Sequence, residues 1–342
     1  MKTNLVYLLY FFFCLLLLIC CAVSFNDYDI YWHLRSGLNF LESGLLPNKD
    51  VLSFTYENKP VAYNGWLFAI TMGLAHKAIN SIEILFPLYK TSCLAALLLL
   101  VFYYNVKKKS NLFVFVLSTI PLLVFTMGLN ARPEILALPL NYALLVVLSE
   151  RKKITYKFGI LLMLLLVFWI NWHDASAIMG LLIIGAFYCQ HLIENIRKHL
   201  PYKQILILGV ITFFVPFFNP NLEHGLFNVL QFKTHQWSAL VEEIKPYSYE
   251  NSFGVISFLL FMSLFVFIIA LKNRQYALGL LIFVFTWQTL KMEKIAIHLA
   301  VLVSFSITYL NPHFGKVFKL QKFGIYAKTL ALLMFFLAAK EV

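Results

Sequence analysis

The sequence predicts an all-α protein, a polytopic transmembrane helical bundle of about eleven or twelve spans that forms one integral membrane domain over residues 1–342. Of its residues, 61% are hydrophobic and 13% are charged, whereas soluble domains average about 45–50% apolar and 25% charged. Apolar runs of roughly the 20 residues needed to span hydrocarbon recur from end to end. The sequence lacks a strict period-two alternation, which argues against an outer-membrane barrel.

Basic clusters between the apolar runs set the expected topology. Under the positive-inside rule, these short loops and the N-terminus face the cytoplasm. The same bias accounts for the net charge of +12 without a nucleic-acid partner. The first run, Leu5 to Val23, exceeds the 7–15 residues of a signal-peptide core, so we expect a retained anchor. The expected spans are 5–24, 82–105, 112–128, 134–149, 156–171, 176–194, 204–218, 253–271, 276–291, 295–310 and 324–339.

Residues 66–79 are moderately apolar but contain His76 and Lys77. A full crossing there would invert every later loop, so we expect a short re-entrant or interfacial helix. Most acidic residues then fall in outward loops, which suggests that any active face is the outer one. The outward loops are 25–65, 129–133, 171–175, 219–252 and 291–294.

The first outer loop contains a predicted amphipathic helix that lies in the membrane interface. Its apolar face comprises Ile30, Leu34, Leu38, Leu41 and Leu45, and its polar face comprises Arg35, Asn39, Glu42 and Ser43. Gly44 and Pro47 are expected to end it. Asp29 stands at its start, where a carboxylate caps free N–H groups and is favoured by the helix dipole. Capping needs one acid, however, and the segment also supplies Asp27 and His33.

This loop resembles the first outer loop of the oligosaccharyltransferase catalytic subunit. The family's spacing is kept by Asp29, by an aromatic pair, and by an arginine six positions after Asp29. It is also kept by Glu42, seven positions after the arginine, and by Gly44, nine positions after it. The aromatic pair is Tyr31-Trp32 and the arginine is Arg35. The match in residue spacing covers about twenty residues. Over the rest of the chain the resemblance is limited to the overall architecture. The chain therefore looks like a member of the GT-C superfamily, which includes protein O-mannosyltransferases and lipid A aminoarabinose transferases.

The resemblance implies transfer of a sugar from a polyprenyl-phosphate or pyrophosphate carrier to a lipid, glycan or protein acceptor. The reaction takes place on the outer face of the cytoplasmic membrane. Asp29 would act as catalytic acid or base, or as a ligand of a divalent cation such as Mg or Mn. Proton removal from the acceptor and stabilisation of the leaving phosphate are the two needs of this chemistry. Asp27 is a candidate second carboxylate, and His33 and Arg35 are candidate substrate contacts.

Further candidates come from the other outer loops. Arg132 could hold the lipid phosphate, although an arginine beside a proline at a helix start is also ordinary turn structure. The neighbouring Glu134 matches no family motif and receives no role. Asp174 is expected to be the N-cap of the next helix, a role compatible with lining the active cavity.

Two more sets lie later in the chain. Glu242 and Glu243 precede a proline in the long loop and could complete the site, although paired glutamates are also typical of solvated surface. Lys291 and Lys294 run against the positive-inside trend, which favours them as phosphate contacts, although lysines also snorkel to interfaces.

Two other functions compete with glycosyl transfer. A transporter or flippase of a lipid-linked sugar would also be polytopic and basic, but it would favour internal repeats and midplane polar residues, which we do not find. A non-catalytic GT-C-like assembly subunit is compatible with the short chain. The sequence lacks a Trp-Trp-Asp motif, which counts against N-glycosylation. A Lys-, Phe- and Ile-rich, Ala-poor composition suggests a low-GC bacterium, which favours undecaprenyl phosphate over dolichol as the carrier. We therefore expect a multi-pass protein of the bacterial inner membrane that acts in the cell envelope.

Overall fold

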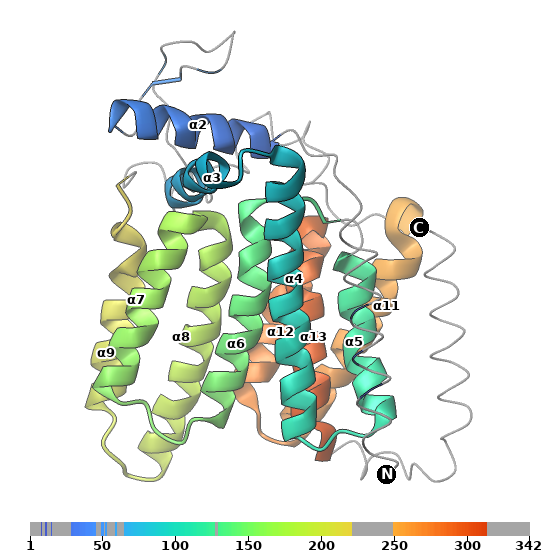
Figure 1. Ribbon diagram of the computed structural model, residues 1–342. Helices are drawn as coiled ribbons and strands as arrows, with labels where there is room; N and C mark the ends of the chain where they lie inside the picture. Colours follow the sequence, from blue (N-terminus) through green and yellow to red (C-terminus); the bar gives the residue numbers. More distant parts are fainter. Residues whose placement is uncertain are drawn as a thin grey trace.

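The computed structural model describes residues 29–45, 49–50, 65–126, 129–220 and 249–312, with positions 8, 11, 15, 52 and 59. These residues form α-helices and short 3₁₀ turns in an upright bundle, with two helices laid across one end (Figure 1). Asp27, Glu242, Glu243 and the predicted span 324–339 lie outside the described residues, and so does the span 5–24 apart from positions 8, 11 and 15.

The upright helices agree closely with the spans expected between residues 82 and 310. Three are long and apolar enough to cross a membrane: α4, the Pro133–Glu150 helix that includes α6, and α8. The upright helices are α4 (Ile82–Lys107), α5 (Leu112–Thr126), α6 (Ala137–Glu150), α7 (Tyr156–Trp172), α8 (Asp174–Arg197), α9 (Lys203–Phe214), α11 (Tyr249–Lys272), α12 (Tyr276–Lys291) and α13 (Ala296–Tyr309). The prediction of an all-helical bundle is therefore confirmed for the described residues, and the three long apolar helices are compatible with a membrane protein.

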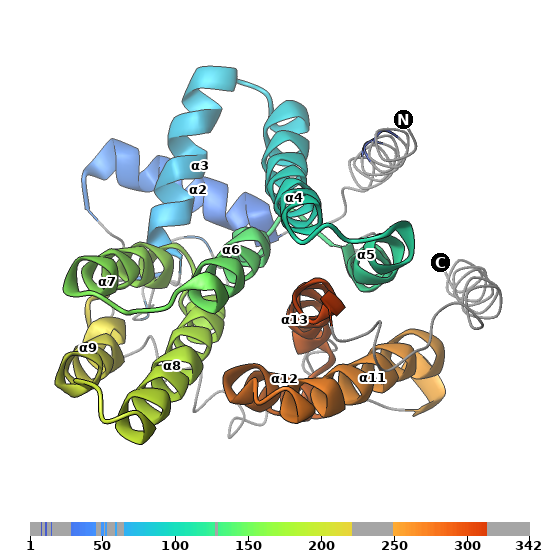
Figure 2. The same ribbon diagram turned by 90° about the horizontal axis from the view of Figure 1, so that it is seen from below.

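The helix α13 lies among α5, α6, α11 and α12 when the bundle is viewed along its axis (Figure 2). It is buried on all sides, as expected of a helix that is apolar around its whole circumference. Two of its hydroxyl groups bond within the protein: Ser306 donates to the Leu302 carbonyl at 2.6 Å, and Thr308 donates to Asn105 Oδ1 at 3.2 Å. These two bonds reduce the cost of burying polar groups on α13, whereas the hydroxyl of Ser304 is buried without a hydrogen bond to any described residue.

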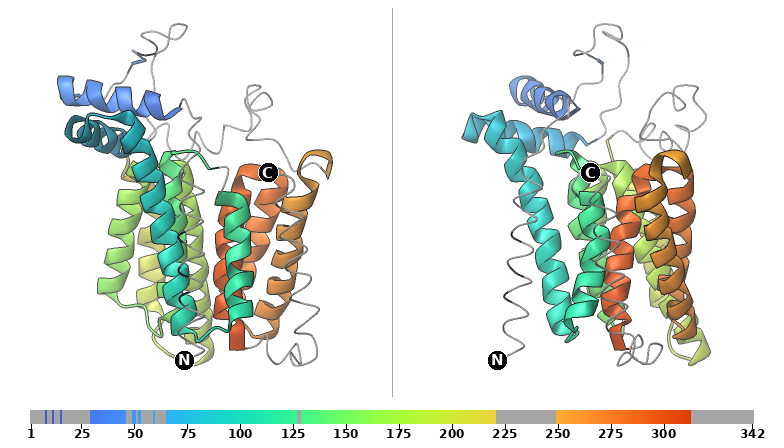
Figure 3. Two further views of the ribbon diagram at one scale, coloured as in Figure 1. Left: turned by 45° about the vertical axis from the view of Figure 1, so that its right-hand side comes forward. Right: turned by 90° about the vertical axis from the view of Figure 1, so that its right-hand side faces the viewer.

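Two helices, α2 (Asp29–Ser43) and α3 (Trp66–Ile79), lie across the end of the bundle at which α4 begins (Figure 3). We call this end the cap end. The amphipathic helix predicted from residue 30 is confirmed, and it ends before Gly44, whose φ of +71° suits glycine. The segment 66–79 does not run along the bundle, in agreement with the expected interfacial helix (Figure 1).

Backbone contact holds α2 and α3 together. A Cβ atom on Gly37 would collide with the carbonyl oxygen of Ala69, and one on Gly73 would lie 2.9 Å from the Gly37 carbonyl carbon. Ile30 and Leu34 of α2 are buried in a small apolar cluster with Phe68 of α3. The paired helices are thus fixed over the bundle, and this fixes the position of Asp29 at the start of α2.

An ionic cluster lies at the other end of the bundle, which we call the far end. Glu150, the last residue of α6, lies 2.6 Å from Lys108 and 3.4 Å from Lys107 at the end of α4. Tyr104 of α4 also donates to Glu150 at 2.9 Å. We call these four residues the far-end network. It joins two neighbouring helices.

Candidate functional site

Polar side chains from four separate segments meet at the cap end of the bundle. They come from the start of α2, the 3₁₀ turn η1 (Pro133–Leu136) and the residue before it, the junction between α7 and α8, and the 3₁₀ turn η6 (Glu293–Ile295) before α13. We call this set the cap-end network. Its members are Asp29, Arg132, Glu134, His173 and Lys294.

Asp29 and Arg132, both predicted as site residues, form an ion pair. Oδ2 of Asp29 lies 3.1 Å from Nη2 of Arg132, although 103 positions separate the residues in the chain (132 − 29). The Asp29 side chain is 66% exposed and that of Arg132 is 18% exposed. Since water screens such a pair, its net contribution to stability is at most about 1 kcal/mol. The contact therefore places a carboxylate beside a cation without binding the two tightly.

Glu134, to which sequence reasoning gave no role, links two elements of the site. One carboxylate oxygen lies 3.1 Å from Nζ of Lys294, and the other lies 3.7 Å from Nε2 of His173. The Glu134 side chain is 17% exposed, so water screens these contacts less than it screens the Asp29 pair. Glu134 therefore holds the ammonium of Lys294 at the cap end and fixes the start of α13 against the start of α6.

His173 is the N-cap of α8, a role that we had predicted for Asp174. His173 has extended backbone angles (φ −163°, ψ 102°), and its Nδ1 accepts the Ser176 N–H at 3.2 Å, so α8 begins one residue earlier than expected. Asp174 is then the first helical residue, with Oδ1 accepting the Ala175 N–H at 2.7 Å. Asp174 is nonetheless buried beside His173, at 2% exposure.

The environment of His173 favours the neutral imidazole. Burial lowers the pKa of His173 below its ordinary value, and the cations Lys294 and Arg132 act in the same direction. The carboxylates of Glu134 and Asp174 oppose this shift without reversing it. Because Nδ1 accepts a backbone N–H, the proton of the neutral ring resides on Nε2, the atom that faces Glu134. His173 can therefore donate toward that carboxylate without adding charge to the site.

Aromatic side chains hold the backbone that carries Arg132 and Glu134. The Pro133 carbonyl accepts from Trp172 Nε1 at 3.2 Å and from the Tyr89 hydroxyl at 3.3 Å. The same hydroxyl lies 3.3 Å from the Arg132 carbonyl oxygen. The ring of Phe68 lies 5.3 Å from the Tyr89 ring and 5.4 Å from the Trp172 ring. The turn is thereby fixed by α4, α7 and α3, so both of its charged side chains start from a rigid backbone.

The remaining predicted residues occupy different surroundings. His33 lies on the face of α2 that packs against α3, and its ring centroid is 5.3 Å from that of Phe68. Arg35 lies on the exposed face of the same helix. The ammonium of Lys291 lies 4.8 Å from the ring centroid of Trp287, on an exposed face of α12. Lys294 instead contacts Glu134. The two lysines that we had grouped in the sequence therefore take part in different local contacts.

A deeper pair of polar residues lies below the cap-end network. His298 is one turn after Lys294 on α13, and Asn141 is two turns after Glu134 on α6. Asn141 Nδ2 and His298 Nδ1 are 3.0 Å apart, and both residues are buried. Polar pairing between α6 and α13 thus continues below the surface, beneath the Glu134–Lys294 contact.

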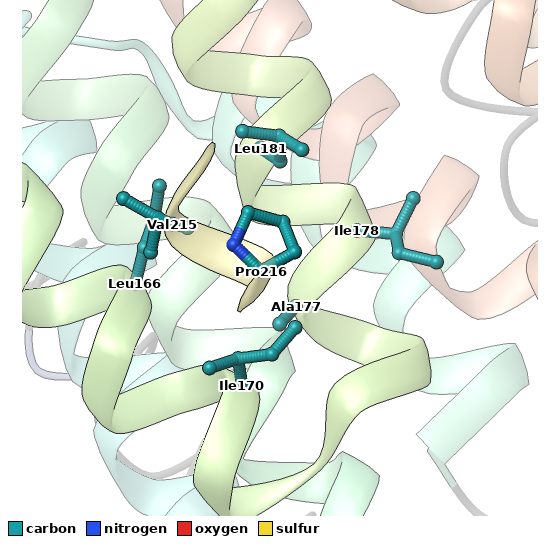
Figure 4. Close-up of a pocket in the computed structure, with 7 residues that line it drawn as sticks. All are labelled: Leu166, Ile170, Ala177, Ile178, Leu181, Val215 and Pro216. Atoms are coloured by element: carbon teal, nitrogen blue, oxygen red, sulfur yellow. The ribbon is translucent and has the colours of Figure 1, made fainter. Parts of the chain in front are cut away.

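A small apolar crevice lies between α7, α8 and the 3₁₀ turn η2 (Val215–Phe217) (Figure 4). Two of its lining residues, Ile170 and Ala177, are each three positions from the His173–Asp174 junction. All of its lining side chains are apolar, namely Leu166, Ile170, Ala177, Ile178, Leu181, Val215 and Pro216.

Metal binding by Asp29 stays a prediction. In the part of the chain that the structure describes, no group of three or more His, Cys, Asp or Glu side chains has the geometry of a metal site. There Asp29 contacts the guanidinium of Arg132.

Comparisons of the chain with protein-family models, with curated proteins and with solved structures find no match. The cap-end network offers an exposed carboxylate next to one cation, and a second cation held by a largely buried carboxylate. Such a set can bind an anion and accept a proton nearby.

Proposed function

We propose that the protein is a membrane glycosyltransferase with the GT-C architecture. It would move a sugar from a polyprenyl-phosphate or pyrophosphate carrier to an acceptor on the outer face of the cytoplasmic membrane. The observation that carries this proposal is the pairing of Asp29 with Arg132, beside the Lys294 ammonium held by Glu134. Residues from the loop that resembles oligosaccharyltransferases and from two later junctions thus lie at one end of the bundle.

In the proposed reaction, Asp29 takes the proton of the acceptor, and the two cations stabilise the negative charge of the leaving phosphate. A hydroxyl or amine of the acceptor attacks C1 of the sugar, and the bond between C1 and the phosphate oxygen breaks. The acceptor proton passes to the Asp29 carboxylate, which acts as general base. Negative charge develops on the leaving phosphate, where Arg132 and Lys294 stabilise it through charge-assisted hydrogen bonds.

We propose that the cap end faces outward and that the N-terminus is cytoplasmic. The support is the distribution of charge: the junctions at the far end carry Lys107, Lys108 and Arg151, whereas the carboxylates of the site lie at the cap end. The carrier's tail would remain in the lipid, with its phosphate at the membrane surface beside Arg132. A bacterial inner membrane with undecaprenyl phosphate as carrier fits the composition.

The test is transfer of radiolabelled sugar from undecaprenyl phosphate to cell-envelope acceptors by the purified protein in vesicles. We expect Asp29→Asn to insert and fold normally but to lose about 10²- to 10⁴-fold in rate, because the proton acceptor is gone. Glu83→Gln is the matched control, since Glu83 is likewise an exposed acid in a first helical turn. Near-wild-type transfer by Asp29→Asn would end the catalytic assignment and leave Asp29 a helix-capping residue.

A further inference from the structure

We infer that the donor phosphate itself opens the Asp29–Arg132 ion pair, so that Asp29 becomes available as a base only when donor is bound. This inference rests on the proposed function and adds a regulation of its site. Without donor, the carboxylate of Asp29 is 3.1 Å from the Arg132 guanidinium. In that contact a carboxylate oxygen of Asp29 is engaged by the guanidinium instead of by a hydroxyl or amine of the acceptor.

Exposure makes this ion pair exchangeable. Asp29 is 66% exposed, so water can replace Arg132 around its carboxylate at little cost. A phosphate can accept two parallel N–H bonds from one guanidinium, a stronger contact than a screened carboxylate provides. Phosphate is therefore expected to win the competition for Arg132.

The architecture determines which partner moves. Arg132 precedes a turn that Tyr89 and Trp172 hold through the Arg132 and Pro133 carbonyls, and its side chain is largely buried. Asp29 is in the first turn of α2 on the exposed side. In the exchange we therefore expect the Asp29 side chain to move while the backbone that carries Arg132 stays in place.

The neighbouring Glu134–Lys294 pair is expected to behave in the opposite way. Its carboxylate is only 17% exposed and also faces His173, so breaking the pair would leave a poorly solvated charge. We therefore expect this pair to stay closed while phosphate binds. The Asp29–Arg132 pair is thus expected to open when the donor binds, whereas the Glu134–Lys294 pair keeps Lys294 in position to contact the donor phosphate.

The test measures binding of undecaprenyl phosphate, the carrier without sugar, to the purified full-length protein in lipid nanodiscs. Removing a competing carboxylate should raise the affinity for phosphate, so Asp29→Asn should bind about two- to fivefold more tightly than wild type. Arg132→Ala should bind about ten- to a hundredfold more weakly. In the Arg132→Ala background, adding Asp29→Asn should give no further gain, because the competition requires the guanidinium. Glu83→Gln should bind like wild type.

The outcomes separate this inference from the proposed function. Unchanged or weaker binding by Asp29→Asn, together with lost transfer, would overturn the exchange and leave the glycosyltransferase proposal standing. Equal tightening in the presence and absence of Arg132 would also overturn the exchange, since it would reflect general electrostatics. Failure of the wild-type protein to bind undecaprenyl phosphate would overturn both. Tight binding with the expected coupling but no transfer would support a phosphate-gated ion pair and remove the catalytic proposal.

Discussion

The two ends of the bundle both carry ionic networks, but the networks are built differently. At the far end, Glu150 takes its partners from the last turn of α4, and every contact joins two neighbouring helices. At the cap end, Asp29, Glu134 and Lys294 come from segments separated by more than a hundred positions, and they meet across α2, η1 and η6.

This difference indicates a different role for each end. Tethering two adjacent helix ends requires only a local contact, and the far-end network supplies that contact with one carboxylate between two lysines. The cap-end network combines an exposed carboxylate, a cation on a fixed turn and a histidine held neutral, arranged around the Pro133 turn. Shifted pKa values and converging charges on separate segments are typical of functional sites. We therefore propose that the far end contributes to stability and that the cap end carries the proposed chemistry.

The largest effect is expected for the orientation of the two ends in the membrane, because a cysteine on a given side either reacts with an impermeant reagent or does not. In a variant whose native cysteines are replaced, we expect Asp50→Cys to react with a membrane-impermeant maleimide on intact spheroplasts. Lys152→Cys, between α6 and α7 at the far end, should react only after lysis. If position 50 were labelled only after lysis, the cap end would face the cytoplasm and the proposed orientation would be wrong.

Packing of the cap gives the next largest effect. Gly37→Ala should destabilise the protein by about 1–3 kcal/mol and reduce transfer, because the new Cβ collides with the Ala69 carbonyl and pushes α2 and Asp29 away. Gly185→Ala in α8 is the control, since nothing lies within 4 Å of the added atom. Thermal unfolding in detergent and the transfer assay measure both effects. A harmless Gly37→Ala would mean that α2 need not be held against α3.

A smaller effect is expected on the donor KM when Lys294 or Lys291, the two lysines of the α12–α13 junction, is replaced. Lys294→Ala should raise the donor KM about ten- to a hundredfold, the worth of one charge-assisted contact to phosphate. Lys291→Ala should change it less than about threefold, because that ammonium lies over Trp287 and its expected loss is a cation–π contact. Equal effects of the two substitutions would indicate general attraction of the donor by positive charge.

Much of the fold could be predicted because hydrophobic runs and charge clusters determine helix positions. The amphipathic spacing from Ile30 to Leu41 gave α2, and His76 with Lys77 correctly indicated that residues 66–79 do not cross the bundle. The cap of α8 was predicted one residue too late. Asp is a common N-cap, and the extended backbone of His173 leaves no trace in the residue types.

The site was only partly predictable from the sequence. Asp29 and Arg132 were singled out separately, but their contact depends on how α2 lies over the turn before α6. Glu134 received no role because its partners, Lys294 and His173, are brought to it by tertiary packing. One signal was available: an acid placed directly after Arg-Pro at the start of an apolar span is costly unless it is paired.

The most direct test of the account compares the carboxylate at the centre of each network. Glu134→Gln should release Lys294, and transfer should fall about ten- to a hundredfold at limiting donor. Glu150→Gln should lower the melting temperature by about 2 °C while transfer per folded protein stays near wild type. Both rates and both melting curves would be measured on the same vesicle preparations. A loss of transfer in Glu150→Gln equal to that in Glu134→Gln would contradict the assignment of chemistry to the cap end.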